Sequence, residues 1–247
     1  MDHRVCACIL NYNMPEATEA LANAVWNQEG VKGLSLRVLD NGSDLIFPAR
    51  CTTDYIEKNV QTTNGWLHFL RMSEDYGYEY VWLLITSVVI NSEHTQILAP
   101  MVDFMNHNPN AVVIHPALTS WSTTSWEHLK SRGGNQPRQT WMVDNIAPLY
   151  RMSWLKDHLF DPELIYAWGI DLETCYKARK EDRGIWVHEA SKVTKITDIG
   201  YSMDRMQMTA QERRILAHKN MEEILSKRYG PLWWSMMLEA YVKEEWR

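Results

Sequence analysis

Along the first 115 residues, short apolar runs alternate with longer segments whose apolar residues recur every three or four positions. The short runs predict strands over residues 4–10, 34–40, 54–60, 78–85 and 110–118. The longer segments predict helices over residues 15–28, 64–76 and 93–107. This alternation is typical of an α/β fold, in which helices cover both faces of a mainly parallel sheet.

The pattern changes after His115. Residues 119–139 are rich in Ser, Thr, Gly and Trp without a sustained period, which predicts a mobile loop. Later segments predict a strand and a helix within 140–157, a helix over 170–182, two short strands within 185–196, and two helices after Thr209 that Gly230-Pro231 divides.

No clean domain boundary is visible. We therefore expect one domain over residues 1–208, with a first half to about 115 and a second half over 116–208. A helical extension over 209–247 follows it.

Several of the predicted strands end on polar residues. In a parallel sheet the carboxyl ends of the strands meet at one edge, where ligands bind. We expect one crevice there, lined by Asn11-Tyr12-Asn13, Asp40-Asn41, Thr86-Ser87 and His115.

Composition narrows the function classes. The chain of 247 residues carries a net charge of −6, which argues against a nucleic-acid partner. Its longest apolar runs are too short to span a bilayer, and its first residues lack the features of a signal peptide. We expect a cytoplasmic protein.

Cys6 and Cys8 share one face of a strand, which predicts small buried thiols.

The end of the chain carries an apolar stripe at helical spacing: Leu232, Trp233, Met236, Met237, Ala240 and Tyr241. Such a stripe predicts packing against the body of the protein or a homo-oligomer formed through the C-terminal helices. Peripheral contact with a membrane is the alternative, and the nearby Glu-rich tail does not favour an anionic bilayer.

Four stretches, in this order, resemble family 2 glycosyltransferases of the GT-A fold: CILNYNMPEATEALANAVWNQ, LRVLDNGSD, NGWLHFLRMSEDYGYEYVWLL and LFDPELIYAWGIDLETCYKAR. The match spans roughly residues 4 to 200. It implies a Rossmann-like GT-A sheet with C-terminal helices added. It also implies transfer of a sugar, with inversion, from a nucleotide-sugar donor, expected to be a UDP-sugar, to a carbohydrate or other hydroxyl acceptor.

The resemblance also implies a donor site. Tyr12 would stack on the base, and the Asp40 carboxylate would accept from the uracil N–H. The remaining nucleoside and diphosphate contacts would come from Asn11, Asn41, Ser43, Asn64 and Gly65. For residues 40–44 an ordinary Asx turn is the alternative.

Inverting transfer needs a carboxylate that takes the proton of the acceptor hydroxyl. By the resemblance Asp171 is this base and Glu173 the fallback, whereas capping of a helix is the alternative role of Asp171. Trp168 would wall the sugar pocket. Trp121 and Trp126 in the long loop would stack on the acceptor, and the alternative is that they only fix the loop in place.

GT-A enzymes usually bind a divalent metal through Asp-x-Asp at the end of the fourth strand, where this chain has Ile85-Thr86-Ser87. Lys195 stands where a late histidine ligand is expected. We therefore predict that no divalent metal is required. Lys195, helped by Lys192 or Arg205, would supply the positive charge for the diphosphate, and Thr86 and Ser87 would bond phosphate or ribose.

Two other functions compete with this prediction. An inactive relative that binds nucleotide sugars or glycans without turnover is consistent with the missing Asp-x-Asp. A nucleotidyltransferase is disfavoured, because LNYNMPEA is not a phosphate loop rich in glycine and lysine.

Overall fold

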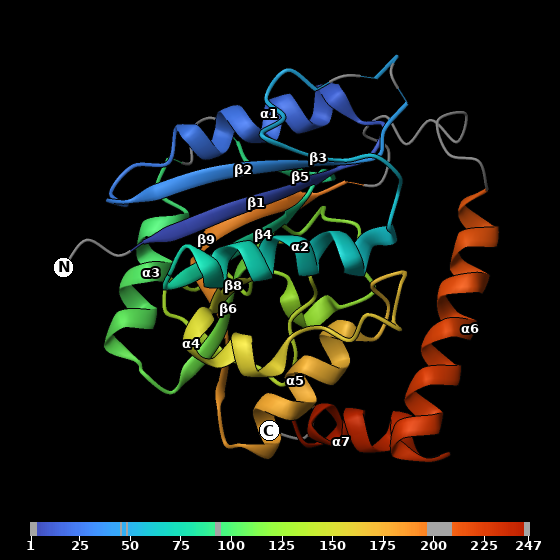
Figure 1. Ribbon diagram of the computed structural model, residues 1–247. Helices are drawn as coiled ribbons and strands as arrows, with labels where there is room; N and C mark the ends of the chain where they lie inside the picture. The colour runs from blue at the N-terminus through green and yellow to red at the C-terminus, as the bar shows by residue number, and fades with distance from the viewer. Residues whose placement is uncertain (1–3, 45, 48, 92–94, 197–208, 245–247) are drawn as a thin grey trace.

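The computed structural model describes residues 4–44, 46–47, 49–91, 95–196 and 209–244 (Figure 1). Its strands are β1 Val5–Asn11, β2 Leu34–Asn41, β3 Asp54–Ile56, β4 Tyr80–Ile85, β5 Val88–Val89, β6 Ala111–Leu118, β7 Arg138–Gln139, β8 Leu149–Arg151 and β9 Gly184–Lys195. Its α-helices are α1 Pro15–Trp26, α2 Gln61–Asp75, α3 Leu98–His107, α4 Met152–Leu155, α5 Ile170–Lys180, α6 Ala210–Tyr229 and α7 Trp233–Glu244.

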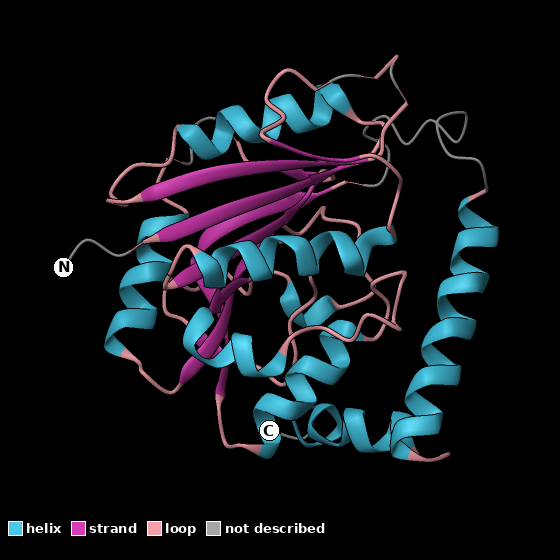
Figure 2. Cartoon of the chain, viewed as in Figure 1, coloured by secondary structure: helices cyan, strands magenta, loops and turns pink. Residues whose placement is uncertain are grey.

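Within the described residues the strands form one nine-stranded sheet in the order β3-β2-β1-β4-β8-β6-β9-β5, with β7 paired to β9 (Figure 2). Strands β1 to β4 are parallel to one another. The antiparallel β8 lies between β4 and β6, so β6 and its parallel neighbour β9 keep the same direction. The predicted α/β class and mainly parallel mixed sheet are confirmed.

Helices cover the sheet because its strands are apolar on both faces. All residues of β1 except Leu10 are buried, as a strand covered on both sides requires. Figure 1 shows α1 and α2 on opposite sides of β1 and β2, and both helices contact these strands. Gly65 allows α2 to approach closely, since a Cβ there would lie 2.7 Å from Leu10 Cδ1. Cys6 and Cys8 are buried and free, as predicted.

Some element boundaries differ from the prediction. Helix α3 begins at Leu98, where the Gln28 side chain caps it by accepting from the N–H groups of Ile97 and Leu98 at 2.9 and 3.2 Å. The two short strands expected over 185–196 are one strand, β9. Its pairing with β6 skips residues 189–191, a bulge in β9 that leaves Glu189 outside the register of this ladder.

The predicted mobile loop over 119–139 has fixed anchors. The buried Glu189 carboxylate accepts from Ser131 Oγ at 3.0 Å, Arg132 N at 2.9 Å and Arg138 Nε at 2.6 Å. The Arg138 guanidinium therefore neutralises the buried charge of Glu189, and Ser131 and the Arg132 backbone add hydrogen bonds to it.

The C-terminal helices α6 and α7 are confirmed, with Gly230 between them. Thr209 and Glu212 form a capping box at the start of α6. Trp233 and Met237 of the predicted stripe are buried, whereas Leu232 and Met236 are exposed; the side chains of Ala240 and Tyr241 lie outside the described residues. Among the described residues, no helix is long and apolar enough to cross a membrane.

Candidate functional site

The parallel strands β1, β2, β4, β6 and β9 end at one edge of the sheet. This brings Asn11, Asn41 and the Thr86-Ser87 turn together, as the sequence predicts. His115 does not join them, because β6 continues to Leu118 and leaves His115 fully buried inside the strand. Its Nδ1 donates to Pro116 O at 2.5 Å and its Nε2 accepts from Ala147 N at 3.2 Å. Burial lowers the His115 pKa to about 4, so the ring is neutral.

Asp40 ties the end of β2 to the end of β1. One carboxylate oxygen accepts from Asn11 Nδ2 at 2.9 Å and the other from Ser43 N at 2.8 Å. Ser43 Oγ in turn accepts from Asn13 N at 2.8 Å. Both Asp40 oxygens already hold protein donors, as in an Asx turn, and a ligand would use their remaining lone pairs.

The other predicted donor residues lie near this turn. Asn41 Nδ2 donates to Asn59 Oδ1 at 3.2 Å, and its Oδ1 accepts from Val60 N at 3.1 Å, so Asn41 fastens the entry to α2. Tyr12 and Asn64 are partly exposed, whereas Gly65 is buried against β1 and serves helix packing.

Lys195 lies beside the Thr86-Ser87 turn. It pairs with Val88 in the antiparallel ladder of β5 and β9, and Ile196 N donates to Ser87 O at 3.0 Å. Thr86 is buried, with its hydroxyl 3.6 Å from Met14 Sδ. Lys192 lies further back in β9, opposite Ala117, and Arg205 is outside the described residues.

Asp144 also belongs to this edge, and the sequence analysis missed it. Ile85 N, at the end of β4, donates to Ile146 O at 3.2 Å, so the segment around Asp144 runs beside the strand end that lacks its own acid. Burial raises the Asp144 pKa, and the charge of Lys195 opposes the rise. The sequence feature that could have pointed to Asp144 was an acid in the polar pair Asp144-Asn145, just before a short strand.

Asp171 lies in the first turn of α5 and is 8% exposed. Its Oδ1 accepts from Leu172 N at 2.8 Å. Burial raises the Asp171 pKa to about 8, the negative charge of Asp144 adds to the rise, and the backbone N–H groups of the helix start oppose it. The negative charge of Asp144 therefore favours the protonated form of Asp171.

The backbone before Asp171 is unusual. Ala167 has a φ of 67° and Gly169 a φ of 91°, and the first is a costly conformation for a residue with a side chain. Thr63 in α2 supports the turn: its Oγ1 accepts from Ala167 N at 3.0 Å and donates to Leu164 O. Trp168 is 42% exposed, with its ring 6.5 Å from the ring of His218 in α6.

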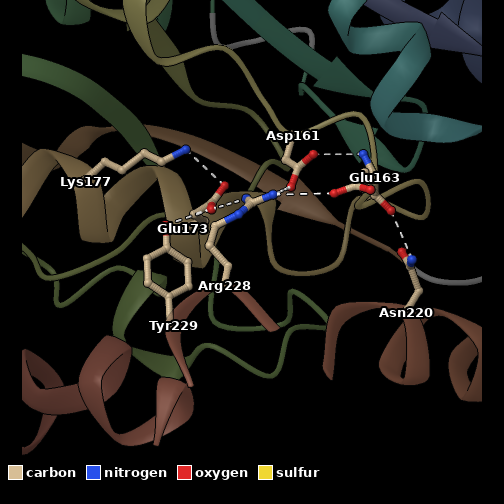
Figure 3. A network of polar contacts seen from close by, with 7 residues as sticks. All are labelled: Asp161, Glu163, Glu173, Lys177, Asn220, Arg228 and Tyr229. Atoms are coloured by element: carbon tan, nitrogen blue, oxygen red, sulfur yellow. Dashed lines mark hydrogen bonds and ion pairs between the residues drawn. The ribbon is translucent and has the colours of Figure 1, made fainter. Parts of the chain in front are cut away.

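Glu173, the fallback base, has a different environment (Figure 3). It is 1% exposed and accepts from Arg228 Nη1 at 2.5 Å, Tyr229 Oη at 2.8 Å and Lys177 Nζ at 3.1 Å. These three donors, two of them from α6, occupy the Glu173 carboxylate.

The loop tryptophans differ in exposure. Trp121 is 77% exposed and available to a ligand. Trp126 packs edge-on against Trp141 and His128, with ring centroids 5.7 and 6.0 Å apart, so it pins the loop.

The fold is that of GT-A-type glycosyltransferases. The structure of GalNAc-T7 with UDP, GalNAc and Mn²⁺ matches with a TM-score of 0.62 and 12% identity over 79% of this chain and 44% of that one. S. aureus TarS matches with a TM-score of 0.59 and 16% identity over 89% of this chain and 43% of that one. TarS 1-349 in complex with UDP matches with a TM-score of 0.59 and 16% identity over 92% of this chain and 72% of that one. The chain thus spans less than half of GalNAc-T7 and of full TarS. No family model and no curated protein matches the sequence.

These comparisons correct one prediction. We predicted that a divalent metal is unlikely, but GalNAc-T7, which shares the fold, was crystallised with Mn²⁺. The prediction examined only the end of β4 and the position of Lys195, whereas a ligand can come from a neighbouring segment. The described residues contain no cluster of three or more potential metal ligands. Asp144, whose segment lies beside the end of β4, is a carboxylate that fits a cation which takes one or two protein carboxylates and completes its shell with phosphate and water.

Proposed function

We propose that this chain transfers a sugar from a nucleotide-sugar donor, a UDP-sugar, to a hydroxyl acceptor with inversion, as in family 2. The observation that carries the proposal is the buried Asp171 carboxylate at the start of α5, whose pKa burial and the charge of Asp144 raise to about 8. Two structural neighbours, GalNAc-T7 and TarS 1-349, were crystallised with UDP, which supports the donor class.

In this proposal Asp171 is the base. Its raised pKa makes the ionised carboxylate a better proton acceptor than an exposed aspartate, and its burial keeps water from competing for the proton. It takes the proton of the acceptor hydroxyl as that oxygen attacks the anomeric carbon. Trp168 and Trp121, both exposed, are the aromatic surfaces offered to the sugars.

The diphosphate would lie at the end of β4. Lys195 and the Thr86-Ser87 turn supply one positive charge and two hydroxyls there. Asp144 would help to hold a divalent cation, which when bound neutralises negative charge on the leaving diphosphate. Asn11, Tyr12, Asp40, Asn41, Ser43 and Asn64 would surround the nucleoside.

We also propose that residues 1–208 carry the transferase and that residues 209–247 are an extension. Met221, Leu225, Trp233 and Met237 of the extension join the main hydrophobic core, so the extension packs on the transferase part.

The test is a transfer assay with UDP-, GDP- and dTDP-sugars in the presence of Mn²⁺, with product stereochemistry read by NMR. We expect turnover of a UDP-sugar with inversion, and a loss of at least 100-fold in kcat for Asp171→Asn with UDP affinity retained. Binding of UDP without turnover of any donor would leave the chain a binding protein and overturn the proposal.

A further inference from the structure

Helix α6 contacts both ends of the segment over residues 161–173, which carries Asp171. In Figure 3 the Arg228 side chain reaches from the end of α6 between two acids of the 161–173 segment. Arg228 Nη1 donates to Glu173 Oε1 at 2.5 Å, and Nη2 donates to Asp161 Oδ2. One guanidinium therefore joins residues that lie on either side of Asp171.

The bridged acids are buried and need this charge. The side chains of Asp161 and Glu173 are 8% and 1% exposed. Tyr229 and Lys177 also bond Glu173, whereas Arg228 is the residue that connects it to Asp161. Loss of a partner from a buried ion pair leaves an incompletely compensated charge, which destabilises the packed position of the segment.

The same helix contacts the middle of the segment. A Cβ on Gly169 would lie 2.8 Å from Met221 Cγ and 3.1 Å from Leu225 Cδ1, so α6 packs directly on the glycine two residues before Asp171. Asn220 Nδ2 donates to Glu163 O at 3.0 Å. The helix thus touches the segment at its start, middle and end.

Asp171 depends on the backbone of this segment for its position. Its carboxylate is held by N–H groups of its own turn, including Leu172 N at 2.8 Å, so a displaced turn displaces the carboxylate. We propose that α6 is a clamp that holds the 161–173 segment with Asp171 in position for transfer, and that Arg228 is a positioning residue. This role rests on the proposed function of Asp171.

The test compares Arg228→Met with Arg214→Met in the full chain. Arg214 is exposed on the same helix, so its substitution makes the same change of charge away from the segment. Hydrogen–deuterium exchange should rise at least tenfold across 161–173 in Arg228→Met, with β1 and β2 unchanged, and should stay at the wild-type level in Arg214→Met. We expect kcat to fall at least tenfold in Arg228→Met while the KM for the donor changes less than twofold.

Arg228→Lys should be intermediate in both measurements, because an ammonium reaches one carboxylate where the guanidinium reaches two. If Arg228→Met does not fold, Arg228→Lys takes its place in the comparison with Arg214→Met. Wild-type exchange and kcat in Arg228→Met would overturn the proposal, and so would a rise in exchange that extends to β1 and β2. If the wild type transfers no sugar, the proposed function fails, and the exchange measurement alone decides whether the clamp exists.

Discussion

Lys195 and Asp144 each favour the charged form of the other at the end of β4. Burial lowers the pKa of Lys195 and the Asp144 carboxylate opposes this change; burial raises the pKa of Asp144 to about 6 and the Lys195 ammonium opposes the rise. The two residues come from distant parts of the chain: β9 pairs with β5 at Lys195, and the segment around Asp144 lies beside the end of β4.

The first prediction concerns the charge of Lys195. Substitution Lys195→Met should weaken UDP binding about tenfold, the loss of one charge-assisted contact to the diphosphate. Uridine, which has no phosphate, should bind wild type and variant equally in calorimetry. Lys219→Met, an exposed change on α6, is the matched control. An equal loss of affinity for uridine and for UDP would mean that Lys195 does not contact the diphosphate.

The second prediction concerns the divalent cation. Asp144→Asn should reduce Mn²⁺ binding in the presence of UDP by at least tenfold, because a neutral amide replaces the carboxylate proposed to hold the cation. The free Mn²⁺ signal in electron paramagnetic resonance measures this directly. Asp103→Asn removes an exposed carboxylate from α3 and should change nothing. Unchanged Mn²⁺ affinity in Asp144→Asn would exclude this carboxylate as a ligand.

The third prediction is a pH dependence of stability in metal-free protein. The folded-state pKa of Asp171 is raised from 3.8 to about 8, so between these values the folded chain retains a proton that the unfolded chain has released. This contribution to stability is full below about pH 4 and is lost as the pH rises toward 8.

Asp171→Asn removes this titration. The variant should gain stability over wild type as pH rises, by about 1 kcal/mol or more at pH 8, or about 2–4 °C in Tm. Urea unfolding with a chelator present, at pH 4, 6 and 8, gives the difference. A gain that is the same at all three pH values would contradict the raised pKa.

The sequence predicts the elements better than the contacts between them. The sequence pattern located β1, β2, β4 and α5, and the family resemblance assigned Lys195 to the site of Thr86-Ser87, where the antiparallel pairing of β5 and β9 brings it. Asp144 escaped notice because its place depends on how the chain before β8 lies against β4, which no local pattern encodes. The environment of Glu173 was equally hidden, since Arg228 and Tyr229 lie 55 and 56 residues away in the chain.

The last prediction concerns the ion pair that anchors the loop over residues 119–139. Arg138 Nε lies 2.6 Å from Glu189 Oε1, with side-chain exposures of 16% and 3%. Arg138→Met leaves the Glu189 carboxylate buried without its cation and should cost about 3–5 kcal/mol in urea unfolding.

Lys130 provides the matched control in the same loop. Its pair with Glu127 spans 3.0 Å, but the Glu127 side chain is 72% exposed, so Lys130→Met should cost less than about 1 kcal/mol. The double variant Arg138→Met/Glu189→Gln should cost less than the sum of its single changes, because neutralising Glu189 removes the charge that the first change left unpaired. Additive costs would mean that the two side chains stabilise the loop independently. A cost for Arg138→Met as small as that of Lys130→Met would mean that water reaches Glu189 and that the loop is not anchored through this pair.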